Sequence, residues 1–556
     1  MRYSSLWPVV VVFCAFLALG AGAATAQAPE NVEERLPAPE PAARDKEPAY
    51  LDRLRPGPPV PAVEDDEQLD RFVLTAVAIT GANAIPPERF APLYDDLLAQ
   101  YVTIDDVAAL ADAITGLYRE KGYFLSRAIV PAQNPASGVL KIEIAEGYIA
   151  DVEFEDGAPA AVRKRLIDVM KERPLRLSTL ERKLALIGDL PGMTVASSKI
   201  EPQLDDFARH RLIVKIKQDR IEGSIYADNR GTKDAGPHQA YVSLSANSAL
   251  TTGDQLTAGL FFIPASPDEL ALVRIAYATP IGGGGLALNT EAMTSSFKAG
   301  GPRAAEEVES RTTRLRVGLS YPLIRRRKLA LLASAGLQGR NFEEERMDAV
   351  RFEDRIRSVY ASMTLRKAHL DGVTSVSAEA TRGLNILGAS TTGLLSRPDA
   401  TAEFTKFNAE FGRLQTVSQK ISVYASVAGQ YALDPLLASE EFSLGGARYG
   451  RAYDYSEFKG EDGVAANVEL RYGGPAVAEF LKSYQFYGFY DYGAVWNDNV
   501  PPQFEKLDLS SAGGGLRLNF SNDLHFNAEL AKPLDGAPFT QGDQSWRGFF
   551  NLSKSF

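Results

Sequence analysis

Cysteine is almost missing from this chain of 556 residues, and histidine is scarce. The single cysteine, Cys14, lies in an N-terminal apolar stretch, so the mature chain would hold neither a thiol nor a disulfide. Its stability would then come from packing and hydrogen bonding. The four histidines, His210, His238, His369 and His525, are scattered along the chain, so we expect no metal site and no cofactor.

Long apolar runs are also missing beyond the N-terminus. None of them is long enough to span a bilayer as a helix. If the mature protein enters a membrane, it must do so as a closed β-barrel, because only a closed sheet satisfies its own backbone there. The formal net charge of -11 argues against nucleic acid as a partner.

Motifs of the common enzyme classes are missing as well. The sequence contains no H-E-x-x-H, no G-x-S-x-G, no Walker loop and no cysteine cluster. The run Gly282–Gly285 resembles a phosphate-binding loop only in composition, and it precedes an alternating segment, so a turn is favoured. We therefore predict that the protein is not an enzyme and has no catalytic residues.

The N-terminus has the order of a secretory signal peptide. The positive residue Arg2 precedes the apolar stretch 9–19, and the small residues Ala24 and Ala26 follow it. We predict a signal peptide at residues 1–26, with cleavage after Ala26. The alternative, an uncleaved membrane anchor, would need a longer apolar core.

Residues 27–70 are rich in proline and in charges of both signs. Repeated proline blocks long helices, and this composition cannot form a core, so we predict a periplasmic linker. Only a short helix near residues 48–54 has room to form there.

Residues 71–147 show the pattern of a folded module, with the predicted order β-α-α-β-β of a small two-layer α+β unit. We expect its first strand at 72–79, its first helix from about residue 88, and its second helix after Thr103 as the N-cap. One face of that second helix is apolar: Ile104, Val107, Leu110, Ile114 and Leu117. Residues 148–219 repeat the same order, which indicates a duplicated module.

From residue 221 to residue 556 the helical pattern stops and short alternating segments follow. In the segment 314–321 the odd positions are apolar and the even positions are polar or small, which is typical of a transmembrane β-strand. At about twenty residues for each strand and its connection, we predict roughly sixteen strands. The polar stretch 297–313 would be an external loop and the tight stretch 325–328 a periplasmic turn.

A soluble β-sandwich is the alternative, since its strands alternate too. Three features favour the barrel: the signal peptide, the aromatic C-terminal residue Phe556, and the charges on the second face of so many strands. We take Phe556 as the C-terminal barrel signal.

This order of signal peptide, two small modules and barrel resembles the outer-membrane translocators of two-partner secretion, the TpsB or haemolysin secretion/activation-type proteins. The modules resemble polypeptide-transport-associated (POTRA) domains. Five residues resemble the first barrel hairpin of that family: Asp228, Asn229, Gly231, Gly253 and Asp254.

Residues 440–464 resemble the loop that turns into the pore in this family. Its tip is Gly450, Arg451, Ala452 and Tyr453, and Phe489, Asp491 and Gly493 match the partner motif on an inward-facing strand. The resemblance implies that Arg451 pairs with Asp491 in the lumen; from the residues alone, both could be solvated lumen charges. The family has glycine where Ala452 stands, and alanine does not reach positive φ cheaply.

The resemblance implies a translocator that captures an unfolded exported protein with its periplasmic modules and passes it outward through the barrel. The apolar face of the second helix in the first module is the candidate capture surface, although module core is the simpler interpretation of most of its residues. A helix near 48–54 would be a candidate plug of the pore. The partners implied are the secreted protein, outer-membrane lipid and the barrel-assembly machinery that inserts the chain.

Two other functions stay open at this stage. The first is a barrel-insertion factor of the wider superfamily, which shares the loop motif. The second is a passive porin, which would need no periplasmic modules.

Overall fold

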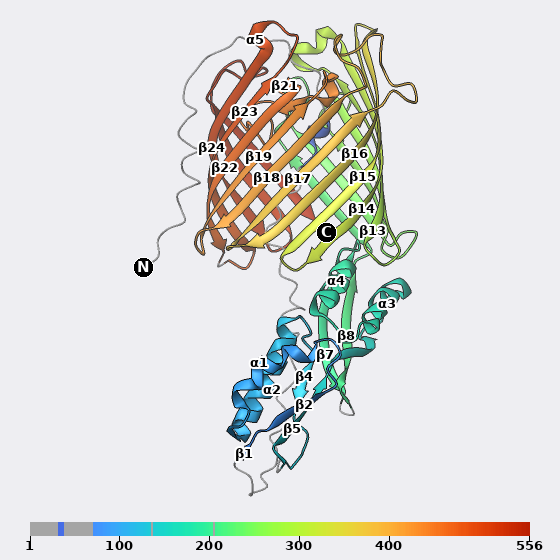
Figure 1. The fold of residues 1–556 in the computed structure, drawn as a ribbon. Coiled ribbons are helices and arrows are strands. Elements are labelled where there is room, and N and C mark those ends of the chain that lie inside the picture. The colour runs from blue at the N-terminus through green and yellow to red at the C-terminus, as the bar shows by residue number, and fades with distance from the viewer. Residues whose placement is uncertain (1–31, 38–70, 135–136, 204–205, 477) are drawn as a thin grey trace.

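The computed structural model describes residues 32–37, 71–134, 137–203, 206–476 and 478–556. The predicted signal peptide and the predicted short helix near residues 48–54 lie outside the described residues. Figure 1 shows a large barrel with two small modules below one of its ends. The predicted fold class, two small α+β modules followed by a β-barrel, is confirmed.

Within the described residues the closed barrel has sixteen strands, each antiparallel to its neighbours. In chain order they are β9 (Ile221–Asp228), β10 (Gln239–Asn247), β11 (Gln255–Phe262), β12 (Leu270–Ile281), β13 (Leu286–Lys298), β14 (Val308–Arg326), β15 (Leu329–Arg346), β16 (Ala349–His369), β17 (Gly372–Gly383), β18 (Thr405–Thr416), β19 (Ile421–Ala432), β22 (Asp462–Pro475), β23 (Leu481–Trp496), β24 (Lys506–Phe520), β25 (Leu524–Pro533) and β26 (Arg547–Ser555).

The barrel closes where β26 meets β9. Asn551–Ser555 pair with Ser224–Asp228, and Phe556 exchanges two backbone hydrogen bonds with Gly223, at 2.8 and 3.0 Å. The C-terminal residue thus completes the ladder that removes the last free sheet edge.

Period-two alternation decides which side chains face outward. On β14, Leu315, Val317 and Leu319 are exposed on the outer wall, while Arg314 and Arg316 face the lumen and pair with carboxylates there. This arrangement suits lipid outside and water inside. No helix among the described residues is long and apolar enough to cross a membrane.

The first module has two small sheets and one long helix. Its elements are β1 (Arg71–Val73), β2 (Ala76–Thr80), η2 (Pro87–Arg89), α1 (Ala91–Tyr94), η3 (Asp95–Leu97), β3 (Tyr101–Thr103), α2 (Ile104–Glu120), β4 (Arg127–Ile129) and β5 (Val139–Ala145). The sheets are β1-β3 and β2-β5-β4.

Two predictions for this module were wrong in detail. The single strand expected at 72–79 is two strands, because the chain changes partner after Val73: Leu74 bonds to Gln100 and Thr75 to Gly138. The helix expected from residue 88 is three short pieces, and Pro92 inside it cannot donate a backbone hydrogen bond. The Thr103 cap is present and forms a capping box with Asp106.

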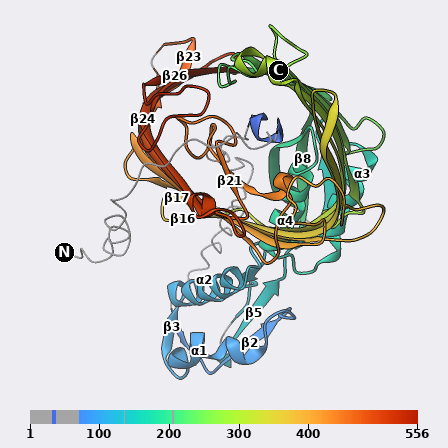
Figure 2. The ribbon, with the colours of Figure 1, turned by 90° about the horizontal axis from the view of Figure 1, so that it is seen from above.

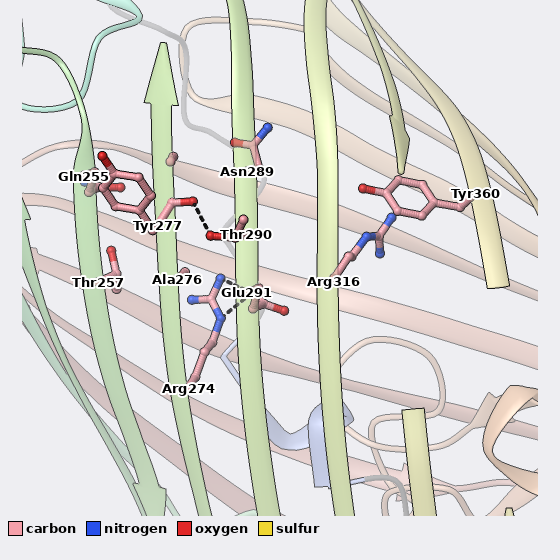
Figure 3. Close-up of a pocket in the computed structure, with 11 residues that line it drawn as sticks. Gln255, Thr257, Arg274, Ala276, Tyr277, Asn289, Thr290, Glu291, Arg316 and Tyr360 are labelled. Carbon is pink, nitrogen blue, oxygen red and sulfur yellow. Dashed lines mark hydrogen bonds and ion pairs between the residues drawn. The ribbon is translucent and has the colours of Figure 1, made fainter. Parts of the chain in front are cut away.

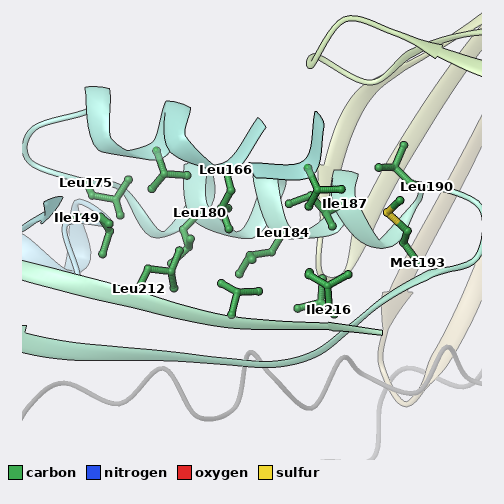
Figure 4. Packing of buried hydrophobic residues seen from close by; sticks show 14 of the residues in the cluster. Ile149, Leu166, Leu175, Leu180, Leu184, Ile187, Leu190, Met193, Leu212 and Ile216 are labelled. Atoms are coloured by element: carbon green, nitrogen blue, oxygen red, sulfur yellow. The ribbon is translucent and has the colours of Figure 1, made fainter. Parts of the chain in front are cut away.

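The second module repeats the design around one sheet of order β6-β8-β7. Its elements are β6 (Tyr148–Phe154), α3 (Ala160–Ile167), η5 (Asp168–Lys171), α4 (Leu177–Gly188), β7 (Met193–Gln203) and β8 (Asp206–Gln218). Figure 4 shows the core between the two helices and the sheet, where Leu166, Leu180, Leu184 and Leu212 are fully buried.

The second module is held against the barrel by polar contacts to the turn between β12 and β13 and to the end of β14. Arg165 donates to the carbonyl of Gly282 at 2.8 Å, and Arg182 donates to the carbonyl of Pro322 at 3.0 Å. Asp189 forms an ion pair with Arg325 at 2.6 Å. The four-glycine run is therefore a turn between β12 and β13, as predicted, and the turn after Arg326 faces the modules.

A short N-terminal segment lies inside the barrel. Its 3-10 helix η1 (Val32–Arg35) is the blue element within the ring in Figure 2. Arg35 donates to the carbonyl of Ala235 at 3.0 Å and to Gln239 Oε1 at 3.2 Å.

Candidate functional site

The connection between β19 and β22 folds into the barrel as a hairpin. It contains η7 (Ala438–Glu440), β20 (Phe442–Leu444) and β21 (Phe458–Gly460), and the last two pair antiparallel. Its tip packs on the wall, with Leu444, Ala452 and Tyr453 buried among residues of β23 to β26. The tip reverses at glycines: Gly445 and Gly450 have φ of 103° and 91°.

The guanidinium of Arg451 lies on the carboxylate of Asp491. Arg451 Nη2 donates to Asp491 Oδ1 at 2.7 Å, Nε donates to Oδ2 at 3.0 Å, and the Arg451 backbone N–H donates to Oδ2 at 3.0 Å. Arg451 is 3% exposed and Asp491 is 0% exposed. A bidentate pair that excludes water in this way is directional and strong.

The alanine at position 452 fits the tip. Ala452 is fully buried and is not one of the residues with positive φ. The left-handed backbone that the tip needs is supplied by Gly450, so a Cβ at position 452 meets no backbone penalty.

Two further carboxylates surround Arg451, and sequence reasoning did not select them. Arg451 Nη1 lies 2.6 Å from Glu469 and 3.7 Å from Glu529. The ring of Phe489 lies under the guanidinium in a cation–π contact, with 3.6 Å from Arg451 Cζ to the ring centre. The signal that would have found both residues is their inward position on alternating strands.

Other arginines balance these carboxylates. Arg230 pairs with Glu529 at 2.5 Å and donates to the backbone carbonyl of Arg451 at 3.1 Å, while Arg471 and Arg517 pair with Glu469. Burial opposes the charge of Arg451, but Asp491, Glu529 and Glu469 together outweigh it and hold the pKa of Arg451 above its ordinary value.

The tip is also tied to the connection between β25 and β26 and to the first residue of β26. The hydroxyl of Tyr453 donates to the carbonyl of Asp535. Asp454 pairs with Arg547 at 2.8 Å, and Glu457 accepts the backbone N–H of Phe539 at 2.7 Å. Burial, with a smaller contribution from Asp454, raises the pKa of Glu457 to about 8.

The residues predicted as a first-hairpin motif divide into two groups. Asp228 accepts the backbone N–H of Arg230, and the amide of Asn229 bonds to Gly548 and Phe550 across the barrel seam. Gly231 lies against the carbonyl of Pro237 in the same connection. This group therefore supports Arg230 beside the Arg451 cluster.

The second group lies at the module end of the barrel. Asp254 accepts the backbone N–H of Thr251 at 2.6 Å and the hydroxyl of Tyr277 at 2.8 Å. Gly253 faces Leu190 of the second module. Gly493, from the predicted partner motif, packs under Leu444 of the hairpin.

The candidate capture residues of α2 lie mostly in the core of the first module. Leu110 and Ile114 are buried there, and Val107 and Leu117 pack against the same cluster. These four residues are therefore corrected to core positions, because the apolar face of α2 covers the sheet. Ile104 is 61% exposed at the start of the helix, beside Tyr101, which is 70% exposed.

In the described part of the chain, no three histidine, cysteine or acidic side chains gather as a metal site would require.

Comparison with known proteins follows the same division into modules and barrel. The family model for the haemolysin secretion/activation protein ShlB/FhaC/HecB matches residues 212–518, more than half of the chain. The model for the POTRA domain, ShlB-type, matches residues 72–147. The chain belongs to the haemolysin secretion/activation protein family.

Relatives of this family member are transporters. It is 23% identical over 491 residues to the heme/hemopexin transporter protein HuxB of Haemophilus influenzae, covering 84% of each chain. It is 24% identical over 409 residues to the outer membrane transporter CdiB of Escherichia coli, covering 72% of this chain and 68% of CdiB. This family member is accordingly an outer-membrane protein that serves protein secretion, with its POTRA modules in the periplasm.

Solved structures share the fold. The structure of CdiB from Escherichia coli matches with a TM-score of 0.74 at 21% identity, covering 92% of this chain and 95% of that one. BamA from Haemophilus ducreyi lacking POTRA domains 1–3 matches with a TM-score of 0.51 at 13% identity, covering 87% and 100%. Both likenesses are ones of fold alone.

Proposed function

We propose that this protein captures an unfolded exported partner protein with its first module and passes it outward through the barrel. The observation that carries the proposal concerns the lumen of the barrel. The lumen is lined by charged side chains and is occupied by two segments of the chain that could move out of it. These are the Arg451 hairpin and the segment 32–37, and neither is a strand of the barrel.

The capture surface in this proposal is the outer end of the first module. Val73 and Tyr101 are direct partners in the β1–β3 pair, Ile104 follows at once, and all three are exposed. The strand β2 has β5 as its neighbour on one side only, in the sheet of the described residues. An extended chain could add to that edge and place apolar side chains on the exposed cluster, which tolerates many sequences.

Substitution at this cluster tests the capture step. The double variant Tyr101→Asp and Ile104→Asp should lower the amount of partner protein in the culture medium. Mass spectrometry of the medium from cells with and without this protein identifies the partner and measures its amount. The matched control is Ile167→Asp, an exposed apolar residue of the second module. Secretion that is equal in the two variants contradicts capture at the first module.

Deletion of residues 71–147 is the stronger test of the function itself. Secretion should stop while the barrel remains in the outer membrane as a heat-modifiable band. Secretion that continues without the module contradicts the proposed role. A change in the amounts of other outer-membrane proteins would instead favour a barrel-insertion factor.

The proposal also covers the membrane around the barrel, the insertion of the chain and the absence of a catalytic role. Lipid of the outer membrane would cover the exposed apolar residues of the strands, and the barrel-assembly machinery would insert the chain. The clustered charges of the lumen form ion pairs with one another, so we assign the protein no catalytic activity.

A further inference from the structure

Two arginines of the lumen wall lie directly opposite each other. Arg314 on β14 and Arg340 on β15 are register partners, and both point into the barrel. Like charges that face each other across a strand pair repel, so this arrangement needs an anion nearby. The wall and the hairpin supply part of it: Arg314 pairs with Glu291 at 2.6 Å and Arg340 with Glu440 at 3.3 Å.

The carboxylate of Glu33 lies between the two arginines. It pairs with Arg314 and, at 3.2 Å, with Arg340. It comes from the short segment 32–37, which forms no strand pairing with the barrel. The neighbours of Glu33 bind elsewhere: Glu34 accepts the hydroxyl of Ser456 at 2.9 Å, and Arg35 reaches Ala235 and Gln239.

The wall around this carboxylate holds polar atoms that Glu33 does not satisfy. A cavity of about 200 Å³ adjoins it, lined by Arg314, Arg316, Arg340, Ser358 and Lys406 among others. Four buried polar atoms there have no hydrogen-bond partner among the described residues: Arg314 Nε, Arg340 Nε, Ser358 Oγ and Ser439 Oγ. Ser358 is only 3% exposed, so its hydroxyl would normally be satisfied.

The adjoining wall is already paired internally. Figure 3 shows Arg274 directed at Glu291, 2.5 Å away, and Arg316 beside Tyr360, with 3.7 Å from Arg316 Cζ to the ring centre. The pair Arg314 and Arg340 differs from these because part of its compensation comes from a segment that is not part of the wall.

We propose that Arg314 and Arg340 form a receptor for a side-chain carboxylate of a peptide segment in the lumen, which Glu33 occupies at rest. This inference rests on the proposed function, since an acidic residue of the exported partner would take the place of Glu33 as the partner enters the barrel. Exchange of one carboxylate for another keeps the arginines compensated at every stage. The N-terminal segment is thus an internal competitor of the transported chain.

Channel block by short peptides tests the receptor without any secretion. The protein is the chain with residues 32–37 deleted and everything else kept, inserted in a planar bilayer. The probe is the peptide Val-Glu-Glu-Arg-Leu-Pro, capped at both ends and added on the module side. This peptide should reduce the current reversibly. The peptide with Glu33→Gln should need about tenfold more for the same block, because it loses both charged contacts. The matched peptide with Glu34→Gln, which keeps its bond to a hydroxyl, should stay within about threefold.

Variants of the wall give the second arm of the test. In Arg340→Gln the peptide should block about tenfold less well, and in the control Arg274→Gln, which does not contact Glu33, the block should be retained. Arg340→Lys serves if Arg340→Gln gives no heat-modifiable barrel. An acidic peptide of unrelated sequence, capped at both ends, should also block the current. Its block should be weaker in Arg340→Gln than in the protein that keeps Arg340.

Three results would overturn the receptor. They are equal block by the native peptide and by its Glu33→Gln form, equal block in Arg340→Gln and its control, and equal block by sodium sulphate at the same concentration. Loss of secretion on deletion of the first module is measured separately, so a failure here leaves the proposed function standing and the reverse also holds.

Discussion

Arg451 and Asp491 meet through three side-chain hydrogen bonds, at 2.7, 3.0 and 3.3 Å, in a place where neither side chain reaches solvent. The tip of the hairpin, residues 445–457, therefore depends on a pair that joins it to the strand β23. Removal of either partner leaves the other charge buried and under-compensated.

Asp491→Asn should therefore destabilise the docked hairpin by about 3–5 kcal/mol, the usual cost of breaking a buried pair. The measurement is thermal unfolding in detergent together with protease cleavage within residues 445–457. The control is Asp523→Asn in the exposed pair with Lys482, which should leave the unfolding temperature unchanged. Cleavage equal to that of the wild type in Asp491→Asn would contradict this role of the pair.

The tip should tolerate glycine at position 452 better than alanine at position 450. Ala452→Gly removes one buried methyl group and adds backbone freedom, at a cost of about 1 kcal/mol. Gly450→Ala puts a Cβ on a residue with φ of 91° and 2.6 Å from Leu509 Cδ1, at a cost of at least about 1–2 kcal/mol. Unfolding temperatures of the two variants compare them directly, and a reversed order would contradict the assignment of the strained position.

Docking of the hairpin should weaken as the pH rises through about 8, the pKa of Glu457 in the docked state. The pKa of a free glutamate lies near 4.5, so docking binds the proton, and its contribution is complete below that pH and lost above 8. The slope between these limits is at most about 1.4 kcal/mol per pH unit. The charged groups that face Glu457 are Asp454, on the same tip, and Arg547, on β26.

Protease cleavage of the hairpin from pH 6 to pH 9 measures this dependence. The wild-type protein should become more sensitive with pH, while Glu457→Gln, which stays neutral, should change little. The variant Asp543→Asn, an exposed carboxylate of the neighbouring connection, should behave as the wild type. A pH profile that Glu457→Gln leaves intact would assign the effect to another group.

The contact between the second module and the barrel should depend on Gly285 and not on Gly282. Both have positive φ, 99° and 68°, so alanine is strained at either position. At Gly285 the new Cβ would also lie 2.6 Å from Pro322 Cγ and 2.7 Å from Leu186 Cδ2, whereas nothing lies within 4 Å at Gly282. Gly285→Ala should broaden the distance distribution between spin labels on the module and the barrel, and equal widths in the two variants would contradict this.

Local sequence patterns predicted much of the fold. The alternation around Arg314, Leu315 and Arg316 predicted the barrel and its two faces, because neighbouring residues of a strand must point to opposite sides. Thr103 predicted the start of α2 because its hydroxyl can cap a helix only from that position. The spacing of Arg451 and Asp491 indicated the hairpin only through a family resemblance.

What the sequence determined by itself was the face of each strand and the ends of the long helices, since both follow from neighbours in the chain. The tertiary structure alone decided that Arg340 faces Arg314, that Glu33 lies between them, and that Glu469 and Glu529 join Arg451. It also decided that Ile104 is the exposed residue of the apolar face of α2, while Leu110 and Ile114 are buried. These facts depend on strand register and on the path of distant segments, and a period of two residues contains no information about either.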